Sequence, residues 1–449
     1  MLLVAHLIGG GSDRIAASAF TAATSSALLV LCLSDRQPYA PKYLRSLLWA
    51  GVPFCCLLAF VALSVIPGSN VLSVGPISKV IAARSLSVDP SATGLELFKF
   101  LGLGATLLVA ERLATSARRL RRMLRALIWI GVIWTLWAIV LLALDVGASG
   151  IGRLSGAFIS PNVAGALIVV TLLLLVGDNP PRDRSPSGAP ASLKRFAPAL
   201  LAVILIVGLV LTASRACAGL GVILSGLLWI WPRRVALLNT LKGRGSLRFI
   251  AGLGATAGIS AAVFAGATLM SRLPRTTADA QDRWAIMKTY AAAAAESPLA
   301  GYGMGSASAL SRLLITRDNY DVFWNIRAPH NLMVQWWVEG GFIGLGLIVA
   351  TLVVIVVRTL SGLGARGRLA MSGPLTAMLF LALHGMLDYD LQIYSIALTG
   401  TFLMGLCLAG SACSQNYWSR FLRRSRRKRH PTADDASPNA GPEDRFFEE

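Results

Sequence analysis

The sequence predicts an all-α membrane protein, a polytopic bundle of about 11 transmembrane helices (10 to 12). Of the 449 residues, 55% are hydrophobic and only 14% are charged, whereas about 25% of the residues in a soluble domain are charged. Apolar runs of about 20 residues, the length that crosses a bilayer, follow one another along the chain. Because backbone groups within lipid must satisfy their own hydrogen bonds, these runs are predicted to be helices.

The apolar runs fix the expected order of spans and domains. We expect spans at residues 15–33, 46–66, 94–110, 126–144, 160–176, 196–212, 216–231, 249–270, 332–357, 369–387 and 391–410. They make one transmembrane domain over residues 1–410. The tail at 411–449 begins as a basic cluster and ends with the composition of a disordered segment. Residues 1–12 are apolar but short, and whether they belong to a further span stays open.

The basic residues predict the orientation of the chain. Most of the 42 lysine and arginine residues lie in alternate connections and in the tail. The positive-inside rule makes that side cytoplasmic and the opposite side periplasmic. The same distribution explains the net charge of +20 without a nucleic-acid partner. The basic start of the tail is expected to contact anionic membrane lipids. None of the six cysteines has the spacing of a metal site.

Three segments on the predicted periplasmic side carry unusual polar residues: 152–162, the tight turn 212–215, and a long loop at about 271–331 that we expect to be partly helical. A charge at membrane depth is costly unless it faces a partner or water. Arg215 is therefore either an arginine reaching outer headgroups or a fixed cation that awaits an anion.

The long loop ends beside a predicted span. An alanine-rich stretch is expected to be helical up to Glu296, and Pro329 suits a helix start shortly after it. The glycines at 301–305 do not follow a strand, so a tight turn or close approach is favoured over a phosphate loop.

Three further features are interpreted without chemistry. The glycines at 340–346 are expected to pack helices closely. His384 is interpreted as a packing residue, and 388–390 (Asp-Tyr-Asp) as a solvated loop in preference to a cation site.

The unusual segments occur in a recognisable order. They are Arg153-Leu154-Ser155-Gly156 with Pro161-Asn162, then Thr212-Ala213-Ser214-Arg215, then Arg283-Trp284 through Pro298–Gly303 to His330-Asn331 and Glu339-Gly340-Gly341. Together, over about residues 150–345, they resemble the O-antigen ligase and O-antigen polymerase family. The family commonly has about twelve spans with the N-terminus inside, whereas here about 11 are expected with the N-terminus outside.

This resemblance implies a bacterial inner-membrane glycosyltransferase that acts at the periplasmic face and needs no metal or other cofactor. The donor is a glycan on undecaprenyl diphosphate, and the acceptor is lipid A-core or a growing glycan. By position, His330 is implied as the catalytic residue, and Arg215 and Arg283 as the diphosphate-binding residues. The residues with implied supporting roles are Arg153, Asn162, Asn331 and Glu339.

The chemistry of these residue types agrees with that implication. Guanidinium groups stay charged and bind phosphate oxygens in pairs, which suits a diphosphate leaving group. Imidazole is the side chain that most readily exchanges a proton near neutral pH, so it suits the activation of an acceptor hydroxyl.

Several functions remain open from the sequence. A ligase is favoured over an O-antigen or exopolysaccharide polymerase of the same family. Of another class, a transporter of lipid-linked sugars or solutes needs a site near the midplane of the bilayer. Lys99 with Glu96 is the one candidate pair for such a site. A purely structural assembly protein is the third class.

Overall fold

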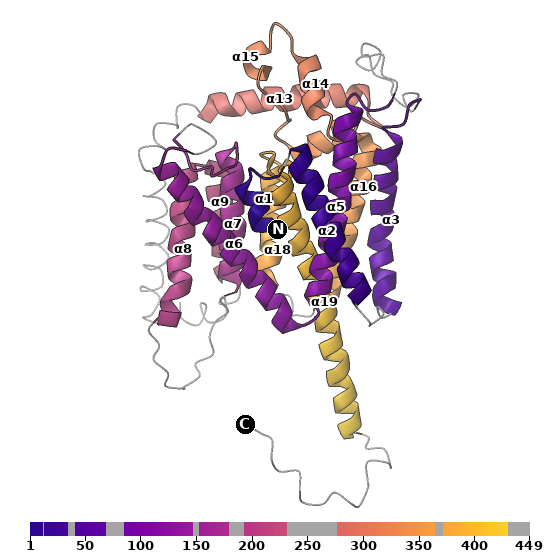
Figure 1. The fold of residues 1–449 in the computed structure, drawn as a ribbon, viewed down its shortest axis with the longest axis vertical. Coiled ribbons are helices and arrows are strands. Elements are labelled where there is room, and N and C mark those ends of the chain that lie inside the picture. Colours follow the sequence, from indigo (N-terminus) through magenta and orange to yellow (C-terminus); the bar gives the residue numbers. More distant parts are fainter. Residues whose placement is uncertain are drawn as a thin grey trace, which may run out of the picture.

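The computed structural model describes residues 1–11, 13–34, 41–68, 85–146, 152–178, 193–230, 276–363 and 371–429. Over these ranges the regular elements are helices, with no strand, which confirms the all-α class (Figure 1). The helices are α1 (Leu2–Leu7), α2 (Arg14–Ser34), α3 (Pro41–Leu63), α5 (Pro90–Leu113), α6 (Ala117–Ala143), α7 (Pro161–Gly177), α8 (Leu193–Thr212), α9 (Arg215–Ile230), α13 (Thr276–Glu296), α14 (Ala307–Leu314), α15 (Tyr320–Phe323), α16 (Leu332–Gly362), α18 (Ser372–Gly385), the 3-10 helix η4 (Asp390–Gln392) and α19 (Tyr394–Arg429).

Five of these helices are long and apolar enough to cross a membrane: α2, α5, α6, α16 and the Tyr394–Ser411 part of α19. Shorter apolar helices include α7, α9 and parts of α3 and α8. A membrane-spanning helical architecture is therefore confirmed. The count of about 11 spans stays a prediction, and the span expected at 249–270 lies outside the described residues.

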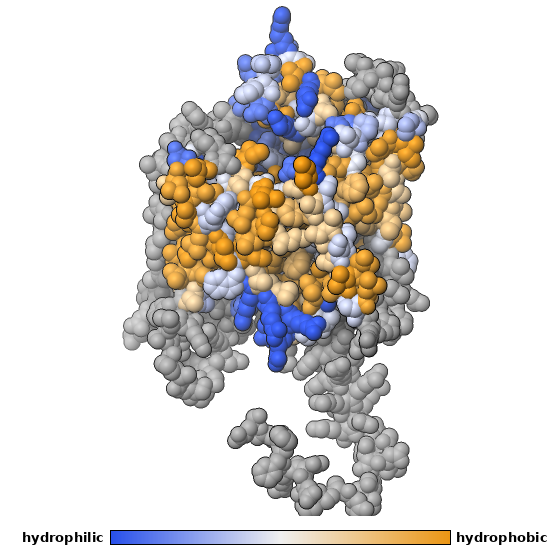
Figure 2. All heavy atoms as spheres, viewed as in Figure 1, coloured by the Kyte–Doolittle hydropathy of each residue, from blue (hydrophilic) through white to orange (hydrophobic). Residues whose placement is uncertain are grey.

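The surface of the bundle is divided into bands. On the face shown in Figure 2, a broad apolar belt crosses the middle of the bundle, with hydrophilic patches above and below. At one end α13 lies across the bundle beneath α14 and α15, so the predicted loop is partly helical as expected (Figure 1). At the other end α6 begins, with Arg118, Arg121 and Arg122 exposed. The loop and these arginines therefore lie at opposite ends, which fits the predicted orientation.

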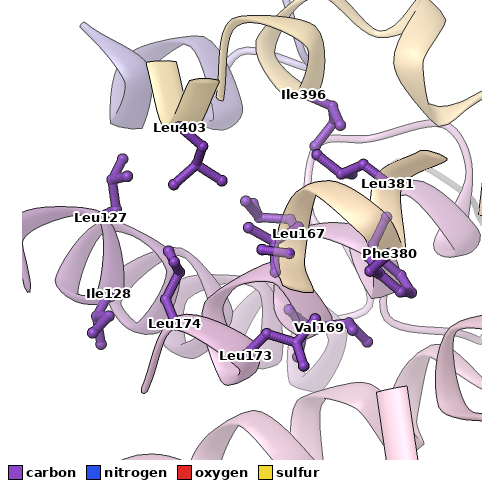
Figure 3. Packing of buried hydrophobic residues seen from close by; sticks show 14 of the residues in the cluster. Leu127, Ile128, Leu167, Val169, Leu173, Leu174, Phe380, Leu381, Ile396 and Leu403 are labelled. Atoms are coloured by element: carbon purple, nitrogen blue, oxygen red, sulfur yellow. The ribbon is translucent and has the colours of Figure 1, made fainter. Parts of the chain in front are cut away.

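Helix α7 lies at the centre of the bundle. Its sequence is apolar on every side, and a helix with that composition is stable only when it is surrounded. Nearly all its residues are buried between α6, α8, α9 and α18. Figure 3 shows this packing through Leu127 and Ile128 of α6, Leu167, Val169, Leu173 and Leu174 of α7, Phe380 and Leu381 of α18, and Ile396 and Leu403 of α19. The Ser160 side chain caps α7 by accepting from the Asn162 amide, which fixes the start of α7 beside the loop.

The first residues pack inside the bundle. Helix α1 has six residues, far fewer than the roughly 20 that cross a bilayer. The His6 ring is buried, with Nδ1 2.9 Å from Ser395 Oγ, and Trp134 Nε1 donates to the His6 carbonyl at 3.1 Å. These contacts tie α1 to α19 and α6.

Helix α16 is broken at Gly341, whose φ of 59° and ψ of −166° are not helical. A break in a membrane helix frees backbone groups that need new partners. Segment 298–303 supplies them: the amides of Tyr302 and Gly303 donate to the carbonyls of Val338 (3.0 Å) and Glu339 (2.8 Å). In return, the amides of 342 and 343 donate to the carbonyls of 298 and 299. The glycine-rich stretch therefore does more than pack helices, because Gly341 permits the break that holds the loop.

We predict that Gly341→Ala loosens the base of the loop. The φ of 59° and ψ of −166° at Gly341 are a combination essentially confined to glycine, and it costs other residues about 1–3 kcal/mol. An added Cβ would also collide with the Leu299 carbonyl group. The free energy of unfolding should fall by roughly 2 kcal/mol or more. The measurement is the thermal midpoint of the purified protein in detergent, which should fall with it. Gly346→Ala is the matched control on the same helix, because a Cβ there meets nothing within 4 Å. Equal midpoints for the two variants would contradict the role assigned to the break.

Candidate active site

The carboxylate of Asp388 is the centre of the candidate site. It lies in the connection between α18 and η4 and is only 2% exposed, so the expectation of a solvated loop at 388–390 is wrong. Asp388 Oδ1 lies 3.1 Å from His330 Nδ1, and Oδ2 accepts from Asn162 Nδ2 at 2.5 Å. The Tyr389 amide donates to Oδ1 at 2.8 Å, and Arg283 Nη2 lies 3.7 Å from Oδ2. A buried carboxylate requires such partners. Three of the four partners, His330, Asn162 and Arg283, are distant from Asp388 in the sequence.

The two acids of this connection are in opposite electrostatic environments. Burial alone would raise the pKa of Asp388, but the hydrogen bond and charge of His330, together with Arg283, lower it to about 2. Burial raises the pKa of Asp390 above its usual range, and contact with His384 offsets only part of that effect. Asp388 is therefore an anion with the Arg283 cation beside it, whereas the environment of Asp390 shifts its pKa in the opposite direction.

His330 is fixed where the loop meets α16. Its φ is 53°, in the left-handed region that side chains seldom adopt. The next residue, Asn331, caps α16 by accepting from the amides of Met333 and Val334, and its Nδ2 donates to the Met386 carbonyl at 2.9 Å. The start of α16 is thereby joined to the end of α18. When Nδ1–H donates to Asp388, the other ring nitrogen, Nε2, is the proton acceptor.

Arg283 reaches the same carboxylate from α13. Its Nη1 donates to the Leu387 carbonyl at 3.1 Å, and the side chain is 44% exposed. One edge of the guanidinium is thus held by the protein. Because a guanidinium has five N–H donors in a planar fork, the exposed edge remains able to bind an anion.

Arg153 connects this carboxylate to the turn before α9. Its Nε donates to the Thr212 carbonyl at 2.8 Å and its Nη2 to the Ala213 carbonyl at 3.2 Å. The same Nη2 lies 3.5 Å from Asn162 Oδ1. Ala213 has a φ of 49°, so the turn is tight, and Arg215 is the first residue of α9 directly after it. A continuous chain of contacts thus runs from this turn through Arg153 and Asn162 to Asp388.

Glu339 lies apart from this chain. It is buried, and its Oε1 accepts from the Ala307 amide and from Gln335 Nε2, both at 3.1 Å. Among the described residues, Glu339 has no hydrogen bond or ion pair with the Asp388 group. Its contacts instead join α16 to the start of α14, which secures the loop.

A second polar layer lies beneath the site. His384 Nε2 is 3.1 Å from Cys217 Sγ, and His384 Nδ1 is 3.3 Å from Asp390 Oδ2. The thiol also lies 3.3 Å from the Asn162 carbonyl oxygen. These side chains are fully buried. The expectation that His384 packs helices is incomplete, since it stacks on Phe380 and also carries this polar network.

The described residues include no group of three or more His, Cys, Asp or Glu side chains that could hold a metal ion.

One comparison with known proteins bears on the family. Residues 200–349, about a third of the chain, match the O-antigen ligase family. The predicted resemblance is thereby confirmed over this stretch, and no curated protein matches the chain. The matched stretch contains Arg215, Arg283, His330 and Glu339, whereas Arg153 and Asn162 precede it and Asp388 follows it.

Asp388 was not among the candidate site residues predicted from the sequence. Asp388 lies beyond residues 200–349, in the short segment between two predicted spans. That segment has no helical spacing pattern that would mark a functional face. One signal was available: a histidine that acts as a base is commonly oriented by a carboxylate, and 388–390 holds two acids at the same predicted end of the bundle.

We predict that the contribution of Asp388 to stability depends on pH. Its pKa is lowered to about 2 from an unfolded value of about 3.9, so the stabilisation is fully present above pH about 4 and is lost as pH falls through about 2. Asp388→Asn should lower the free energy of unfolding by roughly 2–3 kcal/mol at pH 7. Thermal midpoints of the two proteins, measured in detergent from pH 7 to pH 3, should approach one another on acidification. A difference that stays constant with pH would contradict this assignment.

Proposed function

We propose that this protein is a bacterial inner-membrane glycosyltransferase that transfers a glycan from undecaprenyl diphosphate to an acceptor at the periplasmic face. We assign it as a ligase, with lipid A-core as the acceptor. The observation that carries the proposal is the Asp388 carboxylate, which holds His330 and Arg283 together. The proposal is supported by the closeness of these two side chains and by the similarity of residues 200–349 to the O-antigen ligase family.

In this proposal His330 activates the acceptor. Its Nε2 takes the proton of the acceptor hydroxyl while the hydroxyl oxygen forms a bond to the anomeric carbon of the donor. Asp388 stabilises the imidazolium that results and keeps the ring in position. The His330 side chain is 19% exposed, so part of it is accessible to solvent.

The arginines act on the leaving group. The bond between the anomeric carbon and the diphosphate oxygen breaks, and its electron pair remains with the diphosphate. Arg283 and Arg215 stabilise this charge, since guanidinium groups make paired, charge-assisted hydrogen bonds to phosphate oxygens. A single displacement of this kind inverts the anomeric configuration. The proton on His330 then passes to water, and no metal or cofactor takes part.

The remaining predicted residues position these groups. Arg153 holds the turn that precedes Arg215, and Asn162 holds Asp388. Asn331 fixes the backbone next to His330. Glu339 secures the loop that carries Arg283 and His330.

A polymerase of the same family would use the same groups with a growing glycan as acceptor. A transporter has less support. Lys99 Nζ lies 2.6 Å from Glu96 Oε1, one helical turn away on α5, so the candidate pair is engaged with itself. Among the described residues, the polar groups gather instead around Asp388 at the loop end of the bundle.

We predict that His330→Ala abolishes transfer while the protein still accumulates in membranes. Loss of a general base lowers the rate by about 10²–10⁴-fold. The measurement compares lipopolysaccharide and carrier-linked glycan in a deletion strain that expresses either wild type or the variant. Long glycan accumulating on the carrier, with loss from lipid A-core, is the result expected of a ligase.

The other outcomes of the same experiment are equally informative. Single repeat units on the carrier would identify a polymerase. Unchanged pools in the deletion strain would contradict glycan transfer for these substrates and would make a transport assay the next test.

We predict that Arg283→Ala lowers kcat strongly and that Arg283→Lys recovers only part of the loss, because an ammonium cannot bind a phosphate in the bidentate manner of a guanidinium. Initial rates in a reconstituted transfer assay would measure both variants. Lys288→Ala is the control, since it removes an exposed cation from the same helix. If Arg283→Ala and Lys288→Ala have the same rate, Arg283 does not bind the diphosphate.

A further inference from the structure

A cavity of about 280 Å³ lies within the outer loop, apart from the Asp388 group. We propose that it binds one sugar residue that carries an anionic group. This inference rests on the proposed function, because the sugar would belong to the glycan that is transferred or extended. The side chains that supply its chemistry are Ser308, Ser311, Arg312, Trp324, Asn325 and Arg327.

The first wall of the cavity is one face of α14. Ser308, Ser311 and Arg312 are spaced three and four residues apart, so they share a side of the helix. The other side carries Ala307 and Leu310, which are buried in a cluster with residues of α13 and α16. The apolar face of α14 therefore anchors the helix and leaves the polar face toward the cavity.

The second wall is the segment that leads from α15 toward His330. Phe323 is buried in the same apolar cluster, whereas Trp324 is 63% exposed. Ser311 Oγ donates to the Ile326 carbonyl at 2.5 Å, which ties the two walls together. The turn between them is closed by Asn319, which accepts from the Thr316 amide at 2.7 Å and donates to the Leu314 carbonyl at 2.9 Å. The cavity is thus formed before any ligand arrives.

The groups on these walls are those that recognise a sugar. An indole face carries negative charge density and packs against the C–H groups of a sugar ring. The Asn325 amide and the Ser308 hydroxyl supply donors and acceptors for ring hydroxyls, whereas Ser311 is buried and joins the two walls. Pockets for drug-sized ligands hold roughly 300–1,000 Å³, so this smaller cavity suits a single ring.

The two arginines specify an anionic substituent. Within the described part of the chain, Arg312 and Arg327 form no hydrogen bond or ion pair, and the acids of the same loop, Asp318 and Asp321, are not within ion-pair distance of them. Two cations on facing walls suit a phosphate or carboxylate carried by the sugar.

The cavity also lies close to the proposed base. Arg327 precedes His330 by three residues, so their Cα atoms are at most about 11 Å apart. A sugar bound at Arg327 would therefore hold the adjoining part of the same glycan near His330. The cavity and the transfer reaction would then act on one substrate.

The test is binding of simple sugars to the full-length protein in detergent, followed by saturation-transfer difference NMR. The probes are glucose 6-phosphate, glucuronate, glucose and inorganic phosphate. We expect at least one anionic sugar to bind with a Kd roughly tenfold below that of glucose, as charge-assisted hydrogen bonds predict. A preference between glucose 6-phosphate and glucuronate identifies the anionic group.

Matched variants separate the cavity from the rest of the loop. Trp324→Ala, Arg312→Ala and Arg327→Ala should each weaken binding of that sugar by roughly tenfold. Tyr320→Ala and Arg317→Ala remove an exposed aromatic residue and an exposed arginine outside the cavity, and should leave the Kd unchanged.

Three results would overturn the proposal: no binding of any probe by the wild type, glucose binding as tightly as the anionic sugars, or inorganic phosphate binding as tightly as the sugar phosphate. His330→Ala should retain binding. Because the assay involves no turnover, its failure is distinguishable from failure of the proposed transfer reaction, which the glycan pools report.

Discussion

The burial of one charge governs the loop end of this bundle. Asp388 is ionised and almost inaccessible to solvent, and removing such a charge from water costs several kcal/mol unless partners compensate. Those partners arrive from the start of α7, from α13 and from the entrance to α16. Because each partner must lie within hydrogen-bond or ion-pair distance of one carboxylate, satisfying Asp388 also fixes the three elements relative to one another. The candidate active site is a consequence of that requirement.

A comparison with Asp390 shows why Asp388 is the carboxylate that holds these elements together. Asp390 faces His384 in a fully buried layer, where burial raises its pKa. Asp388 lies only two residues away but faces two side chains with solvent access, Arg283 and His330. Two carboxyl groups whose environments shift their pKa values in opposite directions commonly divide the work of a site. Here Asp390 supports the layer below, which also contacts the Asn162 carbonyl through Cys217, and Asp388 holds the layer whose side chains reach solvent.

The features predicted correctly from the sequence are those that depend on the local pattern of residues. The features that were missed depend on contacts between residues far apart in the chain. The apolar runs identified the described helices, and the alanine-rich stretch ended at Glu296 as expected. Arg153 contacts Asn162, and both Asn162 and Arg283 contact Asp388, whereas the roles assigned to these residues stay predictions. Asp388 was not predicted, because its contacts with His330 and Asn162 cross 58 and 226 residues. Glycine suits both close helix packing and a helix break, so the sequence alone does not distinguish these two roles for Gly341. The backbone hydrogen bonds between segment 298–303 and α16 identify the break.

The pairing at that break has a mechanical consequence. Backbone hydrogen bonds join segment 298–303 to both sides of Gly341, and Glu339 holds the start of α14. The apolar cluster then joins α13, α14 and α15 to α16. The loop is therefore attached to α16 along its length, and α16 begins two residues after His330. Arg283, His330 and the cavity between α14 and Arg327 lie on one connected body. In the proposed function, such a body holds donor, base and glycan in fixed relation, so that part of the entropic cost of bringing the reactants together is met by folding.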